Sequence, residues 1–150
     1  MITIRPAAAL DHPRLLAVWL ASVRATHGFL TETDIQSLLP VVRDVALPRL
    51  EVWLAELPEG VAGFVALTDA HVEALFVDPA FFRRGCGQAL IAHARHRKGA
   101  LTVDVNEQNP SALAFYQRHG FEVEGRSPVD ASGNPFPLLH LRERHPSRHP

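Results

Sequence analysis

The chain has 150 residues and a formal net charge of −1, and hydrophobic residue types make up 47% of it. This length suits one domain, and the near-zero charge excludes a general attraction to nucleic acid or to anionic membranes, so we expect neither among its partners. Its single cysteine, Cys86, excludes an internal disulfide, and no apolar run is long enough to span a bilayer, so we expect a cytoplasmic protein.

The first third of the chain predicts one strand and two helices. Residues 2–5 are typical of a strand, and the apolar residues at helical spacing that follow indicate a helix capped by Asp11. Thr31 and Asp34 form the pattern of a capping box, which predicts the start of a second helix. Pro40 should kink or split that helix, because proline lacks the N–H that an interior position needs.

The rest of the chain alternates between strand and helix patterns. We expect strands at 52–55 and 61–67 around a turn at 58–60, a strand at 72–77, a helix from 85 to 98, a strand at 101–105, a helix from 109 to 119, and strands at 121–125 and 136–141. The order β-α-α-β-β-β-α-β-α-β-β predicts a single α/β domain over residues 1–141. Residues 142–150 are expected to form a flexible tail.

The stretch from residue 71 to residue 94 places a basic, glycine-containing loop between a buried strand and a helix. Arg83, Arg84, Gly85 and Gly87 fall where the helix begins, where unpartnered N–H groups and the helix dipole favour anions. This arrangement indicates a phosphate or pyrophosphate pocket, although a turn that uses its glycines only for geometry is also compatible with it. A dinucleotide-binding fingerprint would require glycine at position 90, which is Leu90 here. A P-loop would require Gly-Lys-Ser/Thr, which this loop lacks.

The chain contains two motifs in its second half. The first is Val77-Asp78-Pro79 followed by Phe82-Arg83-Arg84-Gly85-Cys86-Gly87, and the second consists of Asn109, Ala112, Phe115, Tyr116, Gly120 and Phe121. Both resemble motifs of the GCN5-related N-acetyltransferases. Residues 22–30, 105–109 and 125–139 are similar to small bacterial acetyltransferases. The resemblance implies a mixed, mostly antiparallel sheet flanked by helices, acetyl-CoA as cosubstrate, and direct acetyl transfer to a primary amine of a small molecule or peptide. Neither the identity of that amine nor the choice between monomer and homodimer follows from it.

The resemblance also implies a set of cofactor-binding residues, which are Leu75, Phe76, Val77, Arg83, Arg84, Gly85, Cys86, Gly87, Gln88, Asn109, Ala112, Phe115 and Tyr116. The sequence departs from the family pattern at Phe82, where arginine or glutamine is usual. We expect Arg83 and Arg84 to replace the lost side-chain contact to the pyrophosphate.

Amine acetylation needs a proton acceptor, an oxyanion donor and a proton donor for the departing thiolate. Tyr116 occupies the family's general-acid position, and the N–H of Leu75 is the candidate oxyanion donor. His71 and Glu73 lie two residues apart on one strand, so both project to one face, and either is a candidate base. The residues that resemble the acceptor-site wall are Thr26, His27, Phe29 and Phe136.

Several alternatives stay open at this point. Cys86 lies at a helix start beside two arginines, which should lower its pKa and makes an acyl-cysteine route conceivable. His93 and His96 share a helix face but lack a third ligand at fitting spacing, so we expect no metal. The rival function is a non-catalytic module that binds or senses acyl-CoA, and Phe82 is the feature that favours it.

Overall fold

The computed structural model describes residues 1–144. The helices and strands, in chain order, are β1 (Thr3–Pro6), α1 (His12–Thr26), α2 (Glu32–Val41), α3 (Leu47–Arg49), β2 (Glu51–Leu57), β3 (Gly60–Thr68), β4 (His71–Val77), α4 (Cys86–Lys98), β5 (Thr102–Asn106), α5 (Pro110–Arg118), β6 (Phe121–Ser127) and β7 (Leu138–Glu143). Short 3-10 turns occupy Ala9–Asp11 and Pro79–Phe81, and a π-helical turn, Val42–Ala46, joins α2 to α3. Every strand and both long central helices therefore lie where the sequence predicts them.

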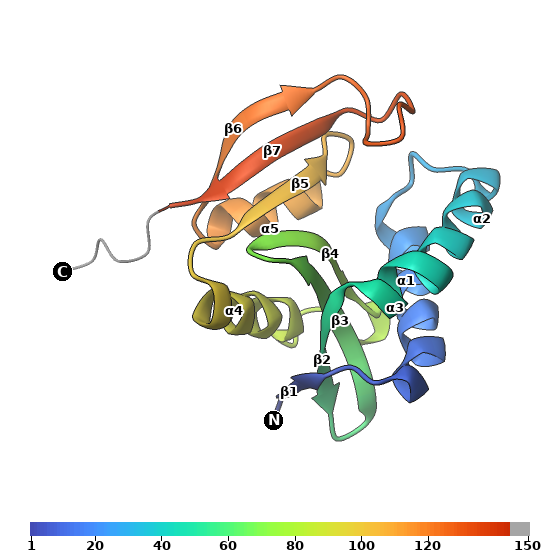
Figure 1. Ribbon diagram of the computed structural model, residues 1–150, viewed down its shortest axis with the longest axis vertical. Coiled ribbons are helices and arrows are strands. Elements are labelled where there is room, and N and C mark those ends of the chain that lie inside the picture. Colours follow the sequence, from blue (N-terminus) through green and yellow to red (C-terminus); the bar gives the residue numbers. More distant parts are fainter. Residues whose placement is uncertain (145–150) are drawn as a thin grey trace.

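The strands form one seven-stranded sheet in the order β1-β2-β3-β4-β5-β7-β6 (Figure 1). Among the strand pairs of residues 1–144, β4 and β5 are parallel and the others are antiparallel. The predicted mixed, mostly antiparallel sheet is thus confirmed. The single parallel pair needs a crossover, and α4 supplies it.

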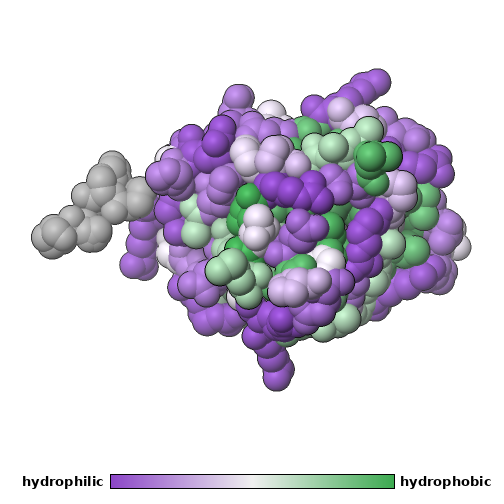
Figure 2. All heavy atoms as spheres, turned by 90° about the horizontal axis from the view of Figure 1, so that it is seen from below, coloured by the Kyte–Doolittle hydropathy of each residue, from purple (hydrophilic) through white to green (hydrophobic). Residues whose placement is uncertain are grey.

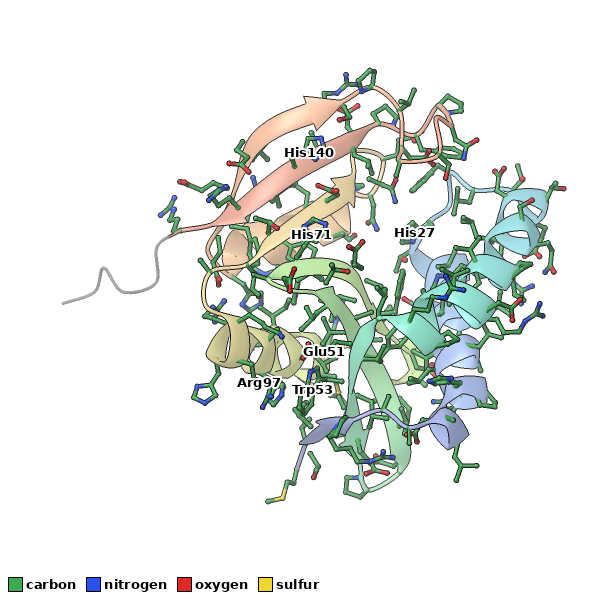
Figure 3. All side chains as sticks on the ribbon, in the orientation of Figure 1. His27, Glu51, Trp53, His71, Arg97 and His140 are labelled. Carbon is green, nitrogen blue, oxygen red and sulfur yellow. The ribbon has the colours of Figure 1, made fainter. Side chains whose placement is uncertain are left out.

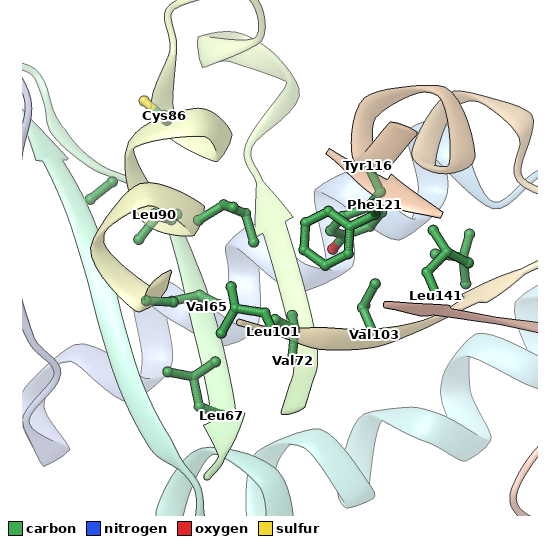
Figure 4. Packing of buried hydrophobic residues seen from close by; sticks show 14 of the residues in the cluster. Val65, Leu67, Val72, Cys86, Leu90, Leu101, Val103, Tyr116, Phe121 and Leu141 are labelled. Atoms are coloured by element: carbon green, nitrogen blue, oxygen red, sulfur yellow. The ribbon is translucent and has the colours of Figure 1, made fainter. Parts of the chain in front are cut away.

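Helices cover both faces of the sheet, and each face has its own hydrophobic core. On one face, α4 and α5 pack over the sheet through Leu90, Ile91 and Tyr116, with Val72 and Val103 beneath them (Figure 4). On the other face, helices α1, α2 and α3 pack on β2, β3 and β4 through residues that include Leu15, Val18, Ile35, Leu47, Leu54 and Phe64. Along β4, Val72, Leu75 and Val77 pack into the first of these cores, and Ala74 and Phe76 pack into the second.

Strands β4 and β5 pair over a short length and then separate. The paired residues are His71 with Thr102 and Val72 with Val103, after which no further pair joins the two strands in the described chain. Strand β4 bulges at this point, because Val72 pairs with Leu67 and Ala74 pairs with Ala66, which leaves Glu73 as the extra residue. The result is an opening between β4 and β5 that begins beside Glu73.

Three local expectations meet different outcomes. The capping box of Thr31 and Asp34 is confirmed, with hydrogen bonds of 3.1 Å and 2.9 Å. Asp11 occupies the N-cap position of α1, as predicted, but its side chain does not cap the helix, because its carboxylate binds Arg5 and the N–H of Ala8 instead. Pro40 lies within the last turn of α2, and the chain continues from there into the π-helical turn.

The domain boundary predicted at residue 141 falls too early. Strand β7 continues through Arg142 to Glu143, and Glu143 is 4% exposed. Its carboxylate accepts the N–H of Leu101 at 3.0 Å and pairs with the guanidinium of Arg95, so these contacts hold the strand end in the sheet. The remainder of the predicted tail, residues 145–150, lies outside the described residues.

The surface is mainly polar. On the face drawn in Figure 2, hydrophilic side chains surround smaller groups of hydrophobic ones. Among residues 1–144, no helix combines the length and apolar character that crossing a membrane requires.

Candidate active site

The start of α4 offers a set of free backbone donors. Gly85 is the N-cap and has φ of 85°, a left-handed conformation that favours glycine. The N–H of Ala89 is the one that bonds to the carbonyl of Gly85, at 2.9 Å, so the N–H groups of Cys86, Gly87 and Gln88 have no intrahelical acceptor. With the positive end of the helix dipole, these donors suit an anionic group such as a diphosphate.

Gly87 has a second reason to be glycine. A Cβ at this position would lie 3.3 Å from the ring of Phe115, which is tighter than ordinary van der Waals contact. The absence of a side chain therefore lets α4 approach α5, and the two predicted cofactor-binding residues Gly87 and Phe115 are neighbours. Phe115 also packs edge-on against Tyr116 with ring centroids 5.2 Å apart.

The two arginines of the loop differ in their surroundings. Arg84 donates to the Glu59 carboxylate at 2.7 Å and lies over the ring of Phe81, so its side chain is directed to the β2–β3 turn. Arg83 is exposed, has φ of 65°, and makes no ion pair with any described residue. Phe82 is 41% exposed beside it. Of the two guanidiniums expected near the anion site, that of Arg83 is therefore the one without a competing carboxylate.

Cys86 does not have the reactive character predicted from its position. Its side chain is 2% exposed and belongs to the core under α4. Burial raises the pKa of the Cys86 thiol above its ordinary value, and the opposing effect of Arg84 is smaller. The expected low pKa was wrong, because desolvation of a thiolate outweighs its attraction to the neighbouring guanidinium.

Strand β4 presents backbone donors to the opening. The N–H of Asp78 bonds to the carbonyl of Ala62 on β3 at 2.8 Å, so strand alternation turns the N–H groups of Phe76 and Ala74 toward β3. The N–H groups of Leu75 and Val77 consequently face β5, where β4 has no partner residue after Val72. Leu75 and Val77 are both among the residues for which the family resemblance implies cofactor binding.

Tyr116 lies in the core beneath the opening. It is 6% exposed, and its ring packs edge-on against Phe121 with centroids 5.2 Å apart (Figure 4). Burial raises the pKa of the Tyr116 hydroxyl, which therefore stays protonated at neutral pH. No hydrogen-bond partner for this hydroxyl occurs among residues 1–144, so it is available as a donor to a bound molecule.

Asn109 begins the helix that carries Tyr116. Its side chain is 6% exposed, and its oxygen accepts the N–H of Ala112 at 3.2 Å, which caps α5. Both residues were expected to bind cofactor, and this hydrogen bond gives the pair a structural role in addition.

The two candidate bases lie on the same face of β4, as predicted. His71 Nδ1 lies 2.7 Å from Thr102 Oγ1, and His71 Nε2 lies 3.6 Å from Asp104 Oδ2. Glu73 is exposed in the bulge and makes no ion pair with any described residue. Both side chains face the α1–α3 side of the sheet, because Val72 between them packs toward α4.

A cavity of about 260 Å³ lies beside Glu73 on that face. Its walls come from α1, the π-helical turn, α3 and the sheet, and apart from Glu73 they are apolar, with Trp19, Val42, Ala46, Leu47, Leu50, Phe64, Ala66, Ala74 and Phe76. The cavity thus offers an apolar surface with one carboxylate at its edge.

The four predicted acceptor-site residues are brought together by a row of aromatic rings. His27 lies 5.4 Å from Phe29 and 6.1 Å from Phe76, and Phe29 lies 5.8 Å from Phe136. Thr26 Oγ1 donates to the carbonyl of Ser22 and lies 2.8 Å from His27 Nδ1. The row joins the α1–α2 loop to the β6–β7 loop across the opening, and burial lowers the pKa of His27.

Asp104 and His140 also belong to this site, and neither was predicted from the sequence. Asp104 Oδ1 lies 2.6 Å from His140 Nδ1, and Asp104 is also within 3.6 Å of His71. Figure 3 shows His71 and His140 on the same side of the sheet. Strand alternation could have found Asp104, since Val103 and Val105 on either side of it are buried. No local pattern could have found His140, because the insertion of β7 beside β5 is a long-range pairing.

His93 and His96 do not form part of this site. The ring of His93 packs at a tilt against Trp53 with centroids 4.3 Å apart, and Arg97 lies over the same Trp53 ring. No group of three or more potential ligands within residues 1–144 is arranged to hold a metal ion.

Comparisons with known proteins agree on one family. The family model described as an acetyltransferase (GNAT) domain matches residues 48–123. Peptidyl-lysine N-acetyltransferase YjaB of Salmonella typhimurium is 42% identical over 142 residues, which cover 94% of this chain and 97% of that protein. The solution structure of apo YjaB from Escherichia coli superposes with a TM-score of 0.89 at 40% identity and covers 96% of this chain and 98% of that one. PaiA N-acetyltransferase from Thermoplasma acidophilum, solved with coenzyme A, shares the fold with a TM-score of 0.76 at 21% identity, covering 95% and 98%.

Proposed function

The chain belongs to the GCN5-related N-acetyltransferase (GNAT) family, and we propose that the acceptor of its acetyl group is the side-chain amine of a lysine in a peptide or protein. It is an acetyl-CoA-dependent N-acetyltransferase. The observation that carries the proposed acceptor is the near-complete overlap with a relative named for peptidyl-lysine acetylation. The free Cys86 and the use of acetyl-CoA support a cytoplasmic location, and both monomer and homodimer stay compatible with these observations.

The residues around the start of α4 fit the cofactor. Acetyl-CoA supplies an acetyl thioester and carries a diphosphate. The free N–H groups of Cys86, Gly87 and Gln88 would hold the diphosphate, and Arg83 would add a positive charge. The N–H groups of Leu75 and Val77 would hold the arm along β4, with Leu75 also serving as oxyanion donor.

Tyr116 is the proposed general acid. A general acid must be protonated before the chemical step, and burial keeps the Tyr116 hydroxyl protonated at neutral pH. Its unpartnered hydroxyl would give its proton to the departing thiolate. Asn109 would act on the reaction only indirectly, by capping the helix that positions Tyr116.

His71 is the proposed base, and Glu73 is the alternative. Nε2 of His71 is free of a hydrogen bond shorter than 3.5 Å, whereas Nδ1 is occupied by Thr102. Glu73 lies at the edge of the apolar cavity, where it would attract the cation of the acceptor. The aromatic row of His27, Phe29 and Phe136 would close the acceptor site from the other side.

The proposal is tested with two matched peptides. One has a blocked N-terminus and a single lysine, and the other has a free N-terminus and norleucine in place of the lysine. We expect acetyl-CoA-dependent thiol release, and a mass increase of one acetyl group, for the lysine peptide only.

Transfer to the free N-terminus of the norleucine peptide, with none to lysine, would refute the lysine proposal. Calorimetry with coenzyme A separates this outcome from loss of cofactor binding. Binding without turnover across peptides and small amines would instead favour a non-catalytic acyl-CoA module.

A further inference from the structure

Five polar side chains form a continuous row across the sheet beside the opening between β4 and β5. The row runs from Thr102 through His71, Asp104 and His140 to Ser127. Three of its links are 2.6–2.7 Å, whereas the link between His71 Nε2 and Asp104 Oδ2 is 3.6 Å. Each of His71, Asp104 and His140 keeps about a third of its side chain exposed, so a ligand can reach the long link.

The hydrogen-bond chemistry of the row assigns the proton positions at its His140 end. An ionised carboxylate only accepts, so His140 must donate its Nδ1 proton to Asp104 Oδ1. A neutral His140 then accepts the Ser127 hydroxyl proton at Nε2, 2.6 Å away. Ser127 and His140 thus hold one oxygen of Asp104, and the other oxygen, Oδ2, faces His71.

We infer that Asp104 Oδ2 and His71 Nε2 together receive the ammonium group of the acceptor. This inference rests on the proposed lysine acetylation and names the site that would bind the lysine head group. Two atoms 3.6 Å apart are too distant to bond to each other, but both lie within hydrogen-bonding reach of one nitrogen placed between them. An ammonium has three donors, so it satisfies both atoms and keeps one hydrogen for a third partner.

The charges around this position favour a cation. The ion pairs of Asp104 are formed with histidines, and neither Asp104 nor Glu73 contacts an arginine or lysine within residues 1–144. Arg142 lies two residues after His140 on β7 and so projects to the same face of the sheet. Its Nε is 3.0 Å from Oε1 of Glu124, with which it forms an ion pair. Asp104 and Glu73 are therefore two carboxylates whose charge is left for a ligand.

The position also suits the chemistry. Val103 pairs with Val72 in the last pair between β5 and β4, so Asp104 is the first β5 residue at the opening, across from Glu73 of the bulge. His71 Nδ1 lies 2.7 Å from Thr102 Oγ1, and in the tautomer that donates its Nδ1 proton to this hydroxyl oxygen, the Nε2 lone pair is left to take a proton from the ammonium. Asp104 then stabilises the imidazolium that forms.

The complete reaction balances with these groups. His71 Nε2 takes one proton from the ammonium and later releases it to solvent. The freed lone pair forms the C–N bond to the acetyl carbon as the C–S bond breaks. The nitrogen loses its second proton to solvent, and Tyr116 protonates the thiolate and is reprotonated. An ammonium and acetyl-CoA therefore yield an acetamide, a free thiol and one released proton.

The test is Asp104→Asn assayed with two acceptors. Asparagine keeps the size of the side chain and an oxygen that accepts from His140, but it lacks the negative charge. With the blocked lysine peptide, we expect KM to rise and kcat/KM to fall about 10- to 100-fold, as for loss of a charge-assisted hydrogen bond. With hydroxylamine, which is uncharged at neutral pH, we expect kcat/KM to stay within a few-fold of the wild-type protein.

A control variant, a second substitution at Asp104 and the pattern of losses separate this inference from other causes. Glu122→Gln removes an exposed carboxylate of the neighbouring strand β6, which pairs with Arg144, and it should leave both acceptors unaffected. Equal losses for both acceptors in Asp104→Asn would show a structural role and overturn the inference, as would wild-type values for both. If Asp104→Asn does not fold, Asp104→Thr suits a strand and is judged by the same comparison. A wild-type protein that acetylates hydroxylamine but no lysine peptide would overturn the proposed function itself.

Discussion

Replacing Tyr116 with phenylalanine tests the proposed general acid with the smallest possible change. The ring is packed between Phe115 and Phe121, each with a centroid 5.2 Å away, and the hydroxyl has no partner among the described residues. Tyr116→Phe therefore keeps the packing and removes no hydrogen bond of the protein. We expect the free energy of unfolding to change by less than about 1 kcal/mol.

The effect on catalysis should be far larger. A positioned general acid contributes about 10²–10⁴-fold to the rate, so kcat should fall by that factor. This loss corresponds to roughly 3–5 kcal/mol of transition-state stabilisation. Because the hydroxyl is expected to interact with the thiolate only as it departs, the Kd for coenzyme A should stay close to that of the wild-type protein.

The assay is thiol release with a working lysine peptide, accompanied by calorimetry with coenzyme A and by urea unfolding. Phe121→Leu is the matched control, because it disturbs the same packing and keeps the hydroxyl. That control should lower stability and leave kcat within a few-fold. A kcat for Tyr116→Phe within about threefold of wild type would refute the assignment, since general acids contribute more than that.

Four further outcomes follow from the structure. Arg83→Glu should weaken coenzyme A binding at least about 10-fold by calorimetry, because it reverses the unpaired charge beside the α4 donors, whereas Arg49→Glu on α3 should not. Cys86→Ala should leave turnover within a few-fold, and acetyl trapped on Cys86 in a rapid-quench mass spectrum would contradict this. Glu143→Ala should lower the free energy of unfolding by roughly 2–3 kcal/mol in urea titrations, because the Leu101 N–H and Arg95 lose their acceptor. Burial lowers the pKa of His27 below its ordinary 6.5. As the pH drops below 6.5, the unfolded state therefore binds a proton at His27 before the folded state does, and the free energy of unfolding falls. His27→Gln should reduce this fall, as measured by thermal melts at several pH values.

The family, the fold class and the acetyltransferase activity could all be predicted from the sequence, and each is confirmed. Period-two and helical patterns are local, so they located the strands and the central helices. The motif from Val77 to Gly87 also marks a place where the backbone, rather than a side chain, sets the geometry. This backbone geometry does not depend on the side chain at position 82. The family resemblance is therefore recognisable although Phe82 replaces the usual arginine or glutamine.

The wrong and missing predictions concern residues whose surroundings are set by contacts with distant parts of the chain. Cys86 has the neighbours of a reactive thiol in sequence, but packing under α4 reverses the direction of its pKa shift. Glu143 lies in a polar segment without periodicity, and its burial depends on Arg95 and Leu101, more than 40 residues earlier in the chain. Similarly, Asp104 and His140 are 36 residues apart, so their hydrogen bond has no signature in either segment.

The place of β7 in the sheet has a consequence for synthesis of the protein. Strand β7 lies between β5 and β6, yet it is translated after both of them and after every other strand. Until it leaves the ribosome, β5 has only two residue pairs with β4, and β6 has no partner strand among the described residues. The nascent chain therefore carries an unpaired edge on β5 and an unpaired strand β6, which are sites of misassembly with other chains. Strand β7 pairs with β5 and with one edge of β6 in one step, so this half of the sheet folds once residue 143 has been translated and not progressively during translation.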